Sequence, residues 1–168
     1  MTELSPENIN VSTWKIPSPL GIIGSHANGE FNGMTASWFT QISMDPALIG
    51  VGIDNKSVTF SLMDQSEYFT LNMFSPEYTK VFVKFSKPAE YTDGFLNKEP
   101  IFLTENKVPI FENATVWFEL KTTQKIDFGT HTLFVGEIVD CKTLNPEERV
   151  AYMGCLLYTS DAADERNS

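Results

Sequence analysis

The chain has 168 residues, of which 42% are hydrophobic and 12% aromatic, and its formal net charge is −10. This size and composition are typical of one globular domain with a full core, and they exclude a disordered chain. The negative charge argues against a nucleic-acid partner, and no apolar run approaches the roughly 20 residues that span a bilayer. The acidic N-terminus lacks the basic and apolar regions of a signal peptide. We therefore expect a cytoplasmic protein without a nucleic-acid or membrane partner.

The two cysteines and the C-terminal segment need separate interpretation. Cys141 and Cys155 belong to no metal-binding or disulfide spacing, so we expect no metal site. Residues 155–165 read CLLYTSDAADE, which resembles one translated frame of a transposase sequencing adapter. We expect the domain to cover 1–154, with 1–15 as an N-terminal arm and 155–168 as a non-native tail. A genuine helical tail is the alternative, because 161–165 is compatible with a helix.

Turn signals divide the first half of the chain into strands and one short helix. Asn28-Gly29 is typical of a hairpin, Asp45-Pro46 of a second turn, and Ser57 of a helix cap. Between these signals the pattern predicts strands over 20–27, 32–43 and 48–53, a helix over 58–65, and a strand over 68–74. The strand over 48–53 is almost wholly apolar, so we expect it at the centre of a sheet.

The second half of the chain is mostly β. Ser75-Pro76 predicts the start of a helix. The elements that follow are this helix, over 76–85, a long irregular connection over 87–104, and strands over 108–111, 114–125 and 132–142. Because strands follow one another with little helix between them, the pattern favours an antiparallel barrel or sandwich over a βαβ fold.

One stretch, NGMTASW at 32–38, combines small residues, hydroxyl groups and a tryptophan in a single predicted strand. Small residues let a planar ligand approach the backbone, and hydroxyl and amide groups bond to its polar edge. From the residues alone, a core tryptophan in a strand stabilised by threonine explains the pattern as well.

NGMTASW resembles the signature of the flavin reductase-like, FMN-binding split-barrel family. Three further segments agree with that family in order and spacing: SMDP at 43–46, FTLN at 69–72 and GTHTLFVGE at 129–137. The resemblance covers 14–154 and implies a mainly β fold, an antiparallel six-stranded split β-barrel of the Greek-key type with a few short helices. It also implies a homodimer with FMN, or alternatively FAD, bound near the subunit interface.

The resemblance also implies roles for individual residues. It assigns the flavin ring to Asn32, Gly33, Met34, Thr35, Ala36, Ser37 and Trp38. The phosphate candidates lie where an apolar strand passes into a helix whose first amides favour an anion; they are Asn55, Lys56, Ser57 and Thr59. A capped surface helix with a solvated lysine is the alternative there.

One of the two histidines is a predicted site residue. The resemblance places His131 near the flavin, where it could donate to a ring carbonyl and act in catalysis. An ordinary histidine at a strand edge is the alternative. His26 matches no motif, and we expect it to be structural.

The sequence departs from the family pattern in two places, and a third family position cannot be compared. Thr130 stands where the family usually has an aspartate that would orient the histidine. Gly94 stands where many relatives have a phosphate-binding lysine, which Lys87 or Lys98 could replace. The C-terminal aromatic contact of the family lies beyond Gly154.

The function that the resemblance implies is a flavin reductase. NAD(P)H would reduce the bound flavin, which would pass electrons to free flavin, a monooxygenase partner or another acceptor. No dinucleotide-binding motif occurs, so the donor would stack over the flavin in the same cleft. Two alternatives stay open: a flavoredoxin-type electron carrier without NAD(P)H activity, and a non-catalytic split barrel for another ligand.

Overall fold

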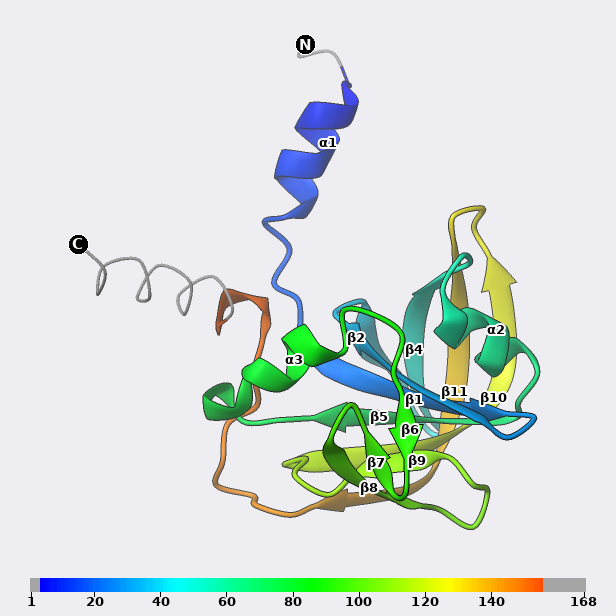
Figure 1. Ribbon diagram of the computed structural model, residues 1–168. Coiled ribbons are helices and arrows are strands. Elements are labelled where there is room, and N and C mark those ends of the chain that lie inside the picture. The colour runs from blue at the N-terminus through cyan, green and yellow to red at the C-terminus, as the bar shows by residue number, and fades with distance from the viewer. Residues whose placement is uncertain (1–3, 156–168) are drawn as a thin grey trace.

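Figure 1 shows the computed structural model of the chain, which describes residues 4–155. A β body carries helix α1, which projects away from it on an extended linker. The expected non-native tail lies outside the described residues apart from Cys155, and its origin stays a prediction. No helix among the described residues is long and apolar enough to cross a membrane.

The body is built on an antiparallel sheet with the strand order β2-β1-β5-β10-β11-β4-β3. Its members are β1 (Gly21–Ala27), β2 (Glu30–Ala36), β3 (Phe39–Met44), β4 (Ala47–Asp54), β5 (Tyr68–Met73), β10 (Val116–Asp127) and β11 (His131–Thr143). The mainly β, antiparallel fold class is therefore confirmed. The sheet has seven strands where six were expected.

The extra strand arises because the strand predicted over 32–43 is two strands. β2 ends at Ala36 and β3 begins at Phe39, and they lie at opposite edges of the seven-stranded sheet. Between them Ser37 and Trp38 leave the ladder, and the carbonyl of Trp38 accepts a hydrogen bond from the amide of Gly52 at 2.7 Å. Local pattern does not reveal this break, because the contact that stabilises it comes from β4.

The prediction of an irregular connection over 87–104 was wrong, because this segment contains three short strands. These are β6 (Tyr91–Thr92), β7 (Phe95–Leu96) and β8 (Glu99–Leu103), which join β9 (Pro109–Phe111) in a second antiparallel sheet. Tight turns connect them, with positive φ at Asp93, Gly94, Asn97 and Lys98. Two-residue strands carry too little periodicity to be recognised from sequence.

Short helices accompany the two sheets. α1 (Pro6–Thr13) forms inside the predicted arm, capped by the side chain of Ser5. α2 (Val58–Asp64) agrees with the prediction, and its cap Ser57 accepts from the amide of Phe60 at 3.0 Å. The helix predicted over 76–85 is divided into a 3-10 turn, Pro76–Tyr78, and α3 (Lys80–Lys84). The division coincides with a tertiary contact, in which Tyr78 donates to the buried carboxylate of Glu99 at 2.6 Å.

The core lies on both faces of β1. Ile22 packs in a cluster with Phe74 and Phe85, whereas its neighbour Ile23 packs in a second cluster with Phe134. Successive side chains of a strand point to opposite faces, so β1 is buried on both sides. β2, its hydrogen-bonded neighbour, is held rigidly by this strand and carries the first part of the candidate site.

Candidate functional site

The end of the motif strand meets the predicted histidine. The Trp38 indole is 60% exposed, and its ring centroid lies 4.6 Å from that of His131 at an interplanar angle of 40°. The two residues are far apart in sequence, and β4 brings them together: Gly52 bonds to Trp38, while Asp54 is the register partner of His131. The structure therefore joins two motifs that the sequence placed near the same ligand.

The beginning of the motif is buried and fully engaged. Asn32 is 3% exposed; its side-chain amide donates to the hydroxyl of Thr59 at 2.8 Å, and its carbonyl accepts from the amide of Ala89 at 2.7 Å. Thr59 is itself completely buried. Asn32 thus ties β2 to α2 and to the segment after α3, and in this state neither Asn32 nor Thr59 presents surface to a ligand.

The middle of the motif packs against the end of α3. The hydroxyl of Thr35 donates to the carbonyl of Phe82 at 2.7 Å, and its amide donates to the carbonyl of Phe85 at 3.0 Å. A Cβ on Gly33 would lie 2.8 Å from the Phe85 ring, closer than real contacts allow, so only glycine lets the ring approach here. Met34 lies partly buried against the second core cluster. These residues hold the strand in place beside α3.

Two cavities adjoin the end of the motif. The first has a volume of about 410 Å³; it is lined by Leu20, Thr35, Ala36, Ser37, Phe82, Val83, Ser86 and Met153. The second has a volume of about 420 Å³; it is lined by Asn10, Thr13, Trp14, Ile16, Ser18, Ser37, Trp38 and Met153. Ser37 and Met153 border both, so the two cavities are neighbours. The sequence prediction did not include the lining residues from α1 or Met153, since no local signal marks them.

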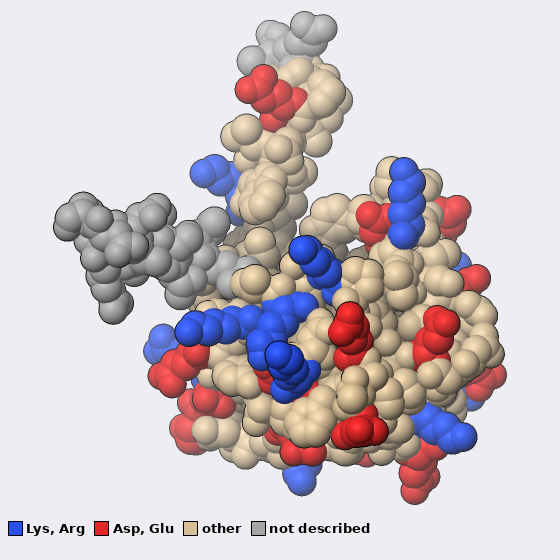
Figure 2. Space-filling model, viewed as in Figure 1, with Lys and Arg blue, Asp and Glu red and all other residues tan. Residues whose placement is uncertain are grey.

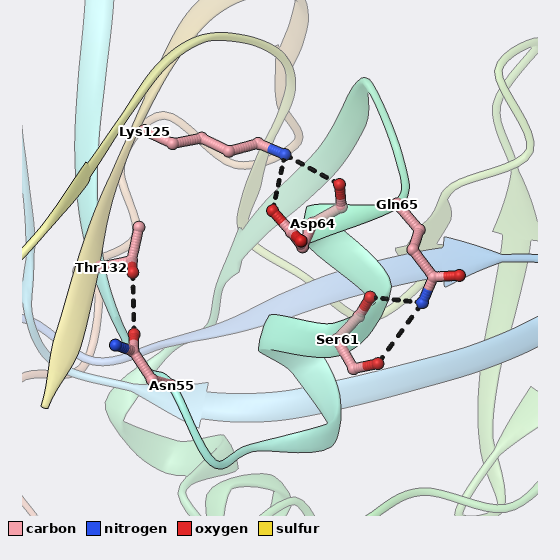
Figure 3. A network of polar contacts seen from close by, with 6 residues as sticks. All are labelled: Asn55, Ser61, Asp64, Gln65, Lys125 and Thr132. Atoms are coloured by element: carbon pink, nitrogen blue, oxygen red, sulfur yellow. Dashed lines mark hydrogen bonds and ion pairs between the residues drawn. The ribbon is translucent and has the colours of Figure 1, made fainter. Parts of the chain in front are cut away.

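The side chain of Asn55 connects the end of β10, the turn that follows it and the start of β11. Its amide donates to the carboxylate of Asp127 at 3.0 Å and to the carbonyl of Gly129 at 3.1 Å, while Thr132 donates to its side-chain oxygen at 2.8 Å. Figure 3 shows the contact with Thr132. Hydrogen bonds from the Gly129 amide and then from Asn55 lower the pKa of Asp127 below its ordinary value. Asn55 therefore fixes the turn that carries His131.

The start of α2, unlike Asn55, presents an exposed charged side chain and backbone amides. Lys56 is exposed, and its backbone amide donates to the carboxylate of Asp54 at 2.8 Å, while Ser57 caps the helix. The Phe60 amide already bonds to Ser57, whereas the amides of Val58 and Thr59 precede the first intrahelical hydrogen bond, which leaves them for an anion. Lys56 forms no ion pair among the described residues, whereas Lys125 pairs with Asp64 at the other end of α2, at 3.0 Å (Figure 3).

His131 itself is half-buried, and its Nδ1 lies 3.0 Å from the hydroxyl of Thr130. Thr130 therefore contacts the ring at the position where the family has an aspartate. His26 lies elsewhere, stacked on Phe31 at 4.3 Å. Burial, followed by the charge of Lys107, lowers the pKa of His26.

Basic side chains gather on one face in spite of the acidic composition. Figure 2 shows this group over α3 and the neighbouring small sheet. Lys80 and Lys84 belong to α3, and Lys87 and Lys98 are exposed nearby in the chain. Lys84 also forms an ion pair with Glu99. Gly94, at the family's lysine position, lies in a turn with φ +85° and open space around it. No group of His, Cys, Asp and Glu among residues 4–155 could hold a metal.

Comparison with known proteins shows the family of the chain. The chain matches the flavin reductase like domain over residues 13–164. The ferric-chelate reductase (NAD(P)H) of Archaeoglobus fulgidus is 30% identical over 145 residues, covering 83% of this chain and 83% of the relative. The stachydrine N-demethylase reductase subunit of Rhizobium meliloti is 32% identical over 122 residues, covering 73% of this chain and 52% of the relative. This chain thus spans about half the length of that relative.

Among solved structures, an FMN-binding protein from Thermus thermophilus with bound 1-cyclohex-2-enone is 28% identical, with a TM-score of 0.70. The similarity covers 81% of this chain and 78% of that one. The match to the family extends over most of the chain, and it includes the strand ends that carry Trp38 and His131. The chain therefore belongs to the flavin reductase like domain family.

Proposed function

We propose that this protein is an NAD(P)H-dependent flavin oxidoreductase of the cytoplasm that binds FMN, or alternatively FAD. The observation that carries the proposal is the meeting of Trp38, His131 and the β4–α2 turn at one place in the fold. Bound flavin would supply the redox chemistry, and the protein would hold the ring and exclude water around it.

The first cavity fits the ring in its chemistry. Ala36 and Ser37 are small, and the hydroxyl of Ser37 forms no hydrogen bond within the described part of the chain, so it is free to bond to a polar edge. Phe82 and Met153 line the same cavity with apolar surface. An isoalloxazine ring has one apolar end and one edge of carbonyls and nitrogens, which this lining complements.

The start of α2 fits the phosphate. Lys56 and the amides of Val58 and Thr59 supply positive charge and donors in an otherwise acidic protein. Thr59 supports this proposal indirectly, because its buried hydroxyl accepts from Asn32 and so links the phosphate end to the motif strand. Asn55 supports it through the turn that it holds beside His131. Lys87 and Lys98 are the candidates for a second phosphate contact.

His131 would donate to the ring and stabilise the negative charge that develops on it. Its neighbour Thr130 lies close enough to fix the ring orientation. We include His131 as the candidate catalytic residue.

The comparison supports a donor and a partner of the kinds proposed. One relative is named as an NAD(P)H-dependent reductase, and the other is named as the reductase subunit of a demethylase. By analogy, this chain would take electrons from NADH or NADPH and deliver them to free flavin, a monooxygenase partner or another acceptor.

An absorption spectrum tests the proposal first. The purified protein titrated with FMN is expected to bind it and to show a flavin band with altered shape. Rapid mixing with NADH, and separately with NADPH, is then expected to bleach that band. A protein that binds no FMN contradicts the proposal. A protein that binds FMN but is not reduced by either donor is a flavin-binding electron carrier instead.

We also propose that the protein is a homodimer, on the basis of an open apolar groove on the large sheet. The groove has a volume of about 410 Å³; it is lined by Pro19, Phe39, Thr40, Gln41, Ile49, Leu71, Met73, Phe118 and Ile138. Ile42 and Met44 on β3 are exposed as well. Apolar surface of this kind commonly marks an interface.

The matched variants Gln41→Arg and Gln124→Arg test the dimer by light scattering after size exclusion. Both positions are exposed, but only Gln41 lines the groove. We expect Gln41→Arg to shift the protein from dimer to monomer, since like charges would meet across the interface, and Gln124→Arg to leave the dimer intact. A monomeric parent protein, or a dimeric Gln41→Arg variant, contradicts the proposed interface.

A further inference from the structure

The second cavity shares Ser37 and Trp38 with the proposed flavin site, but its other wall has no role in that site. One wall is Ser37 and Trp38 from the motif, and the other is Asn10, Thr13, Trp14 and Ile16 from α1 and the residues after it. Ser37 and Met153 border both cavities, so a molecule here would lie beside a ring held in the first. Electron or hydride transfer needs such adjacency between two reactants.

The indole of Trp14 is exposed but held in place. α1 has no buried residue, and Trp14 is 64% exposed, so core packing does not explain this tryptophan. Its indole N–H donates to the side-chain oxygen of Asn10 at 3.0 Å, which fixes the orientation of both groups. The indole and the Asn10 amide are therefore held relative to each other, which lowers the entropy cost of ordering these two groups around a ligand.

The polar groups of the cavity suit a planar carboxamide. The hydrogen bond from Trp14 occupies the oxygen of Asn10 and leaves its NH₂ group as a donor. The NH₂ group of Asn10 and the hydroxyl of Ser37 form no other hydrogen bond within residues 4–155. A ring with a carboxamide substituent would find indole surface for its face and donors for its carbonyl.

We propose that Trp14 and Asn10 form, with Trp38 and Ser37, the pocket for the nicotinamide ring of the electron donor. This proposal rests on the proposed flavin reductase function, and it makes α1 a determinant of donor binding. Helix α1, which projects from the body (Figure 1), supplies one wall of this pocket.

The test without flavin is tryptophan fluorescence on titration with NAD⁺. The chain has three tryptophans, of which Trp117 is buried. We expect saturable quenching in the parent protein, and a smaller quenched fraction in Trp14→Phe, because the indole that contacts the probe is gone. Unsaturable quenching, or the same quenched fraction in Trp14→Phe, overturns the proposal whether or not the protein binds FMN.

The kinetic test separates donor binding from flavin binding. We expect Trp14→Ala to raise KM for NADH on the order of fivefold to tenfold, as the loss of an aromatic stack would, with kcat and the Kd of FMN changed less than about twofold. Trp14→Phe should retain most of the affinity. Val11→Ala is the matched control, since Val11 is exposed on α1 but does not line this cavity.

Equal effects of Trp14→Ala and Val11→Ala, or an unchanged KM in Trp14→Ala, overturn the proposal while the flavin site stands. Failure of the parent protein to bind FMN is a different result, because it contradicts the proposed function itself. In that case the NAD⁺ titration alone decides whether the pocket binds nicotinamide.

Discussion

The two halves of the NGMTASW segment have opposite environments. Asn32 and Thr35 are tied to α2 and α3 by hydrogen bonds between 2.7 and 3.0 Å, whereas Ser37 and Trp38 stand free of the ladder beside two cavities. A single sequence motif thus contains a scaffold half and a ligand half. Changes in the first half should affect folding, and changes around the second should affect binding and catalysis.

The largest expected effect is on stability, from Asn32→Ala. The variant leaves the amide of Ala89 and the buried hydroxyl of Thr59 without their partner, which should lower the free energy of unfolding by about 2–3 kcal/mol. Urea denaturation measures this. Gln65→Ala removes an exposed amide that also forms hydrogen bonds, and should change stability by no more than about 0.5 kcal/mol. Equal losses in the two variants would show that Asn32 is not a special scaffold residue.

The next effect is on flavin affinity, from Lys56→Ala. Loss of a charged contact to the phosphate should weaken FMN binding roughly tenfold, with little change in stability. The same variant should bind riboflavin, which has no phosphate, as tightly as the parent protein does. Lys125→Ala is the control, because Lys125 pairs with Asp64 at the far end of α2. If the affinity for riboflavin falls as much as that for FMN, Lys56 does not contact the phosphate.

The third effect is on rate, from His131→Ala. Removal of a donor to the ring should slow flavin reduction by NADH roughly tenfold, measured by stopped flow, while the urea midpoint changes little. Thr130→Val deletes the contact to Nδ1 and should have a smaller effect in the same direction. An unchanged reduction rate in His131→Ala would leave this residue as an ordinary strand-edge histidine.

The smallest effect concerns pH and His26, which lies on β1 beside the motif strand β2. The lowered pKa of His26 means that the folded state holds a proton on this ring less readily than the unfolded state, whose value is near 6.5. The neutral His26 ring therefore makes its full contribution to the free energy of unfolding above pH 6.5. This contribution is lost as the pH falls from 6.5 to the pKa of the folded state. His26→Gln should therefore lose less stability than the parent protein between pH 7.5 and 5.5 in urea titrations. Parallel curves for the two proteins would contradict this.

Sequence pattern predicted the long elements of the fold well, because each has its own periodicity and turn signals. β1, β4, β5, β10, β11 and α2 fall close to their expected ranges. The break at Ser37-Trp38, the small sheet within 87–104 and the division of the helix after Ser75 were not predicted. Each of these depends on a partner distant in sequence, such as Gly52 for Trp38 or Glu99 for Tyr78.

In the candidate site, too, local features were predicted from the sequence and long-range contacts were not. The residue types of the motif indicated a planar ligand, and the start of α2 indicated an anion, because both signals are local. Which motif residues face a cavity and which are buried was not readable from alternation. The strand leaves its sheet within the motif, and the side-chain direction changes at that point.

The sequence by itself determined the family and the mainly β class, and it predicted the approximate place of the ligand, since these follow from composition, periodicity and short motifs. Only the tertiary structure decided that Asn32 and Thr59 support the site from beneath, that Trp38 meets His131, and that Trp14 shares a cavity with Ser37. The reason is that these pairings join β2 to α2, the segment between β2 and β3 to β11, and α1 to the body. Pairings across so many intervening residues leave no periodic trace in the chain.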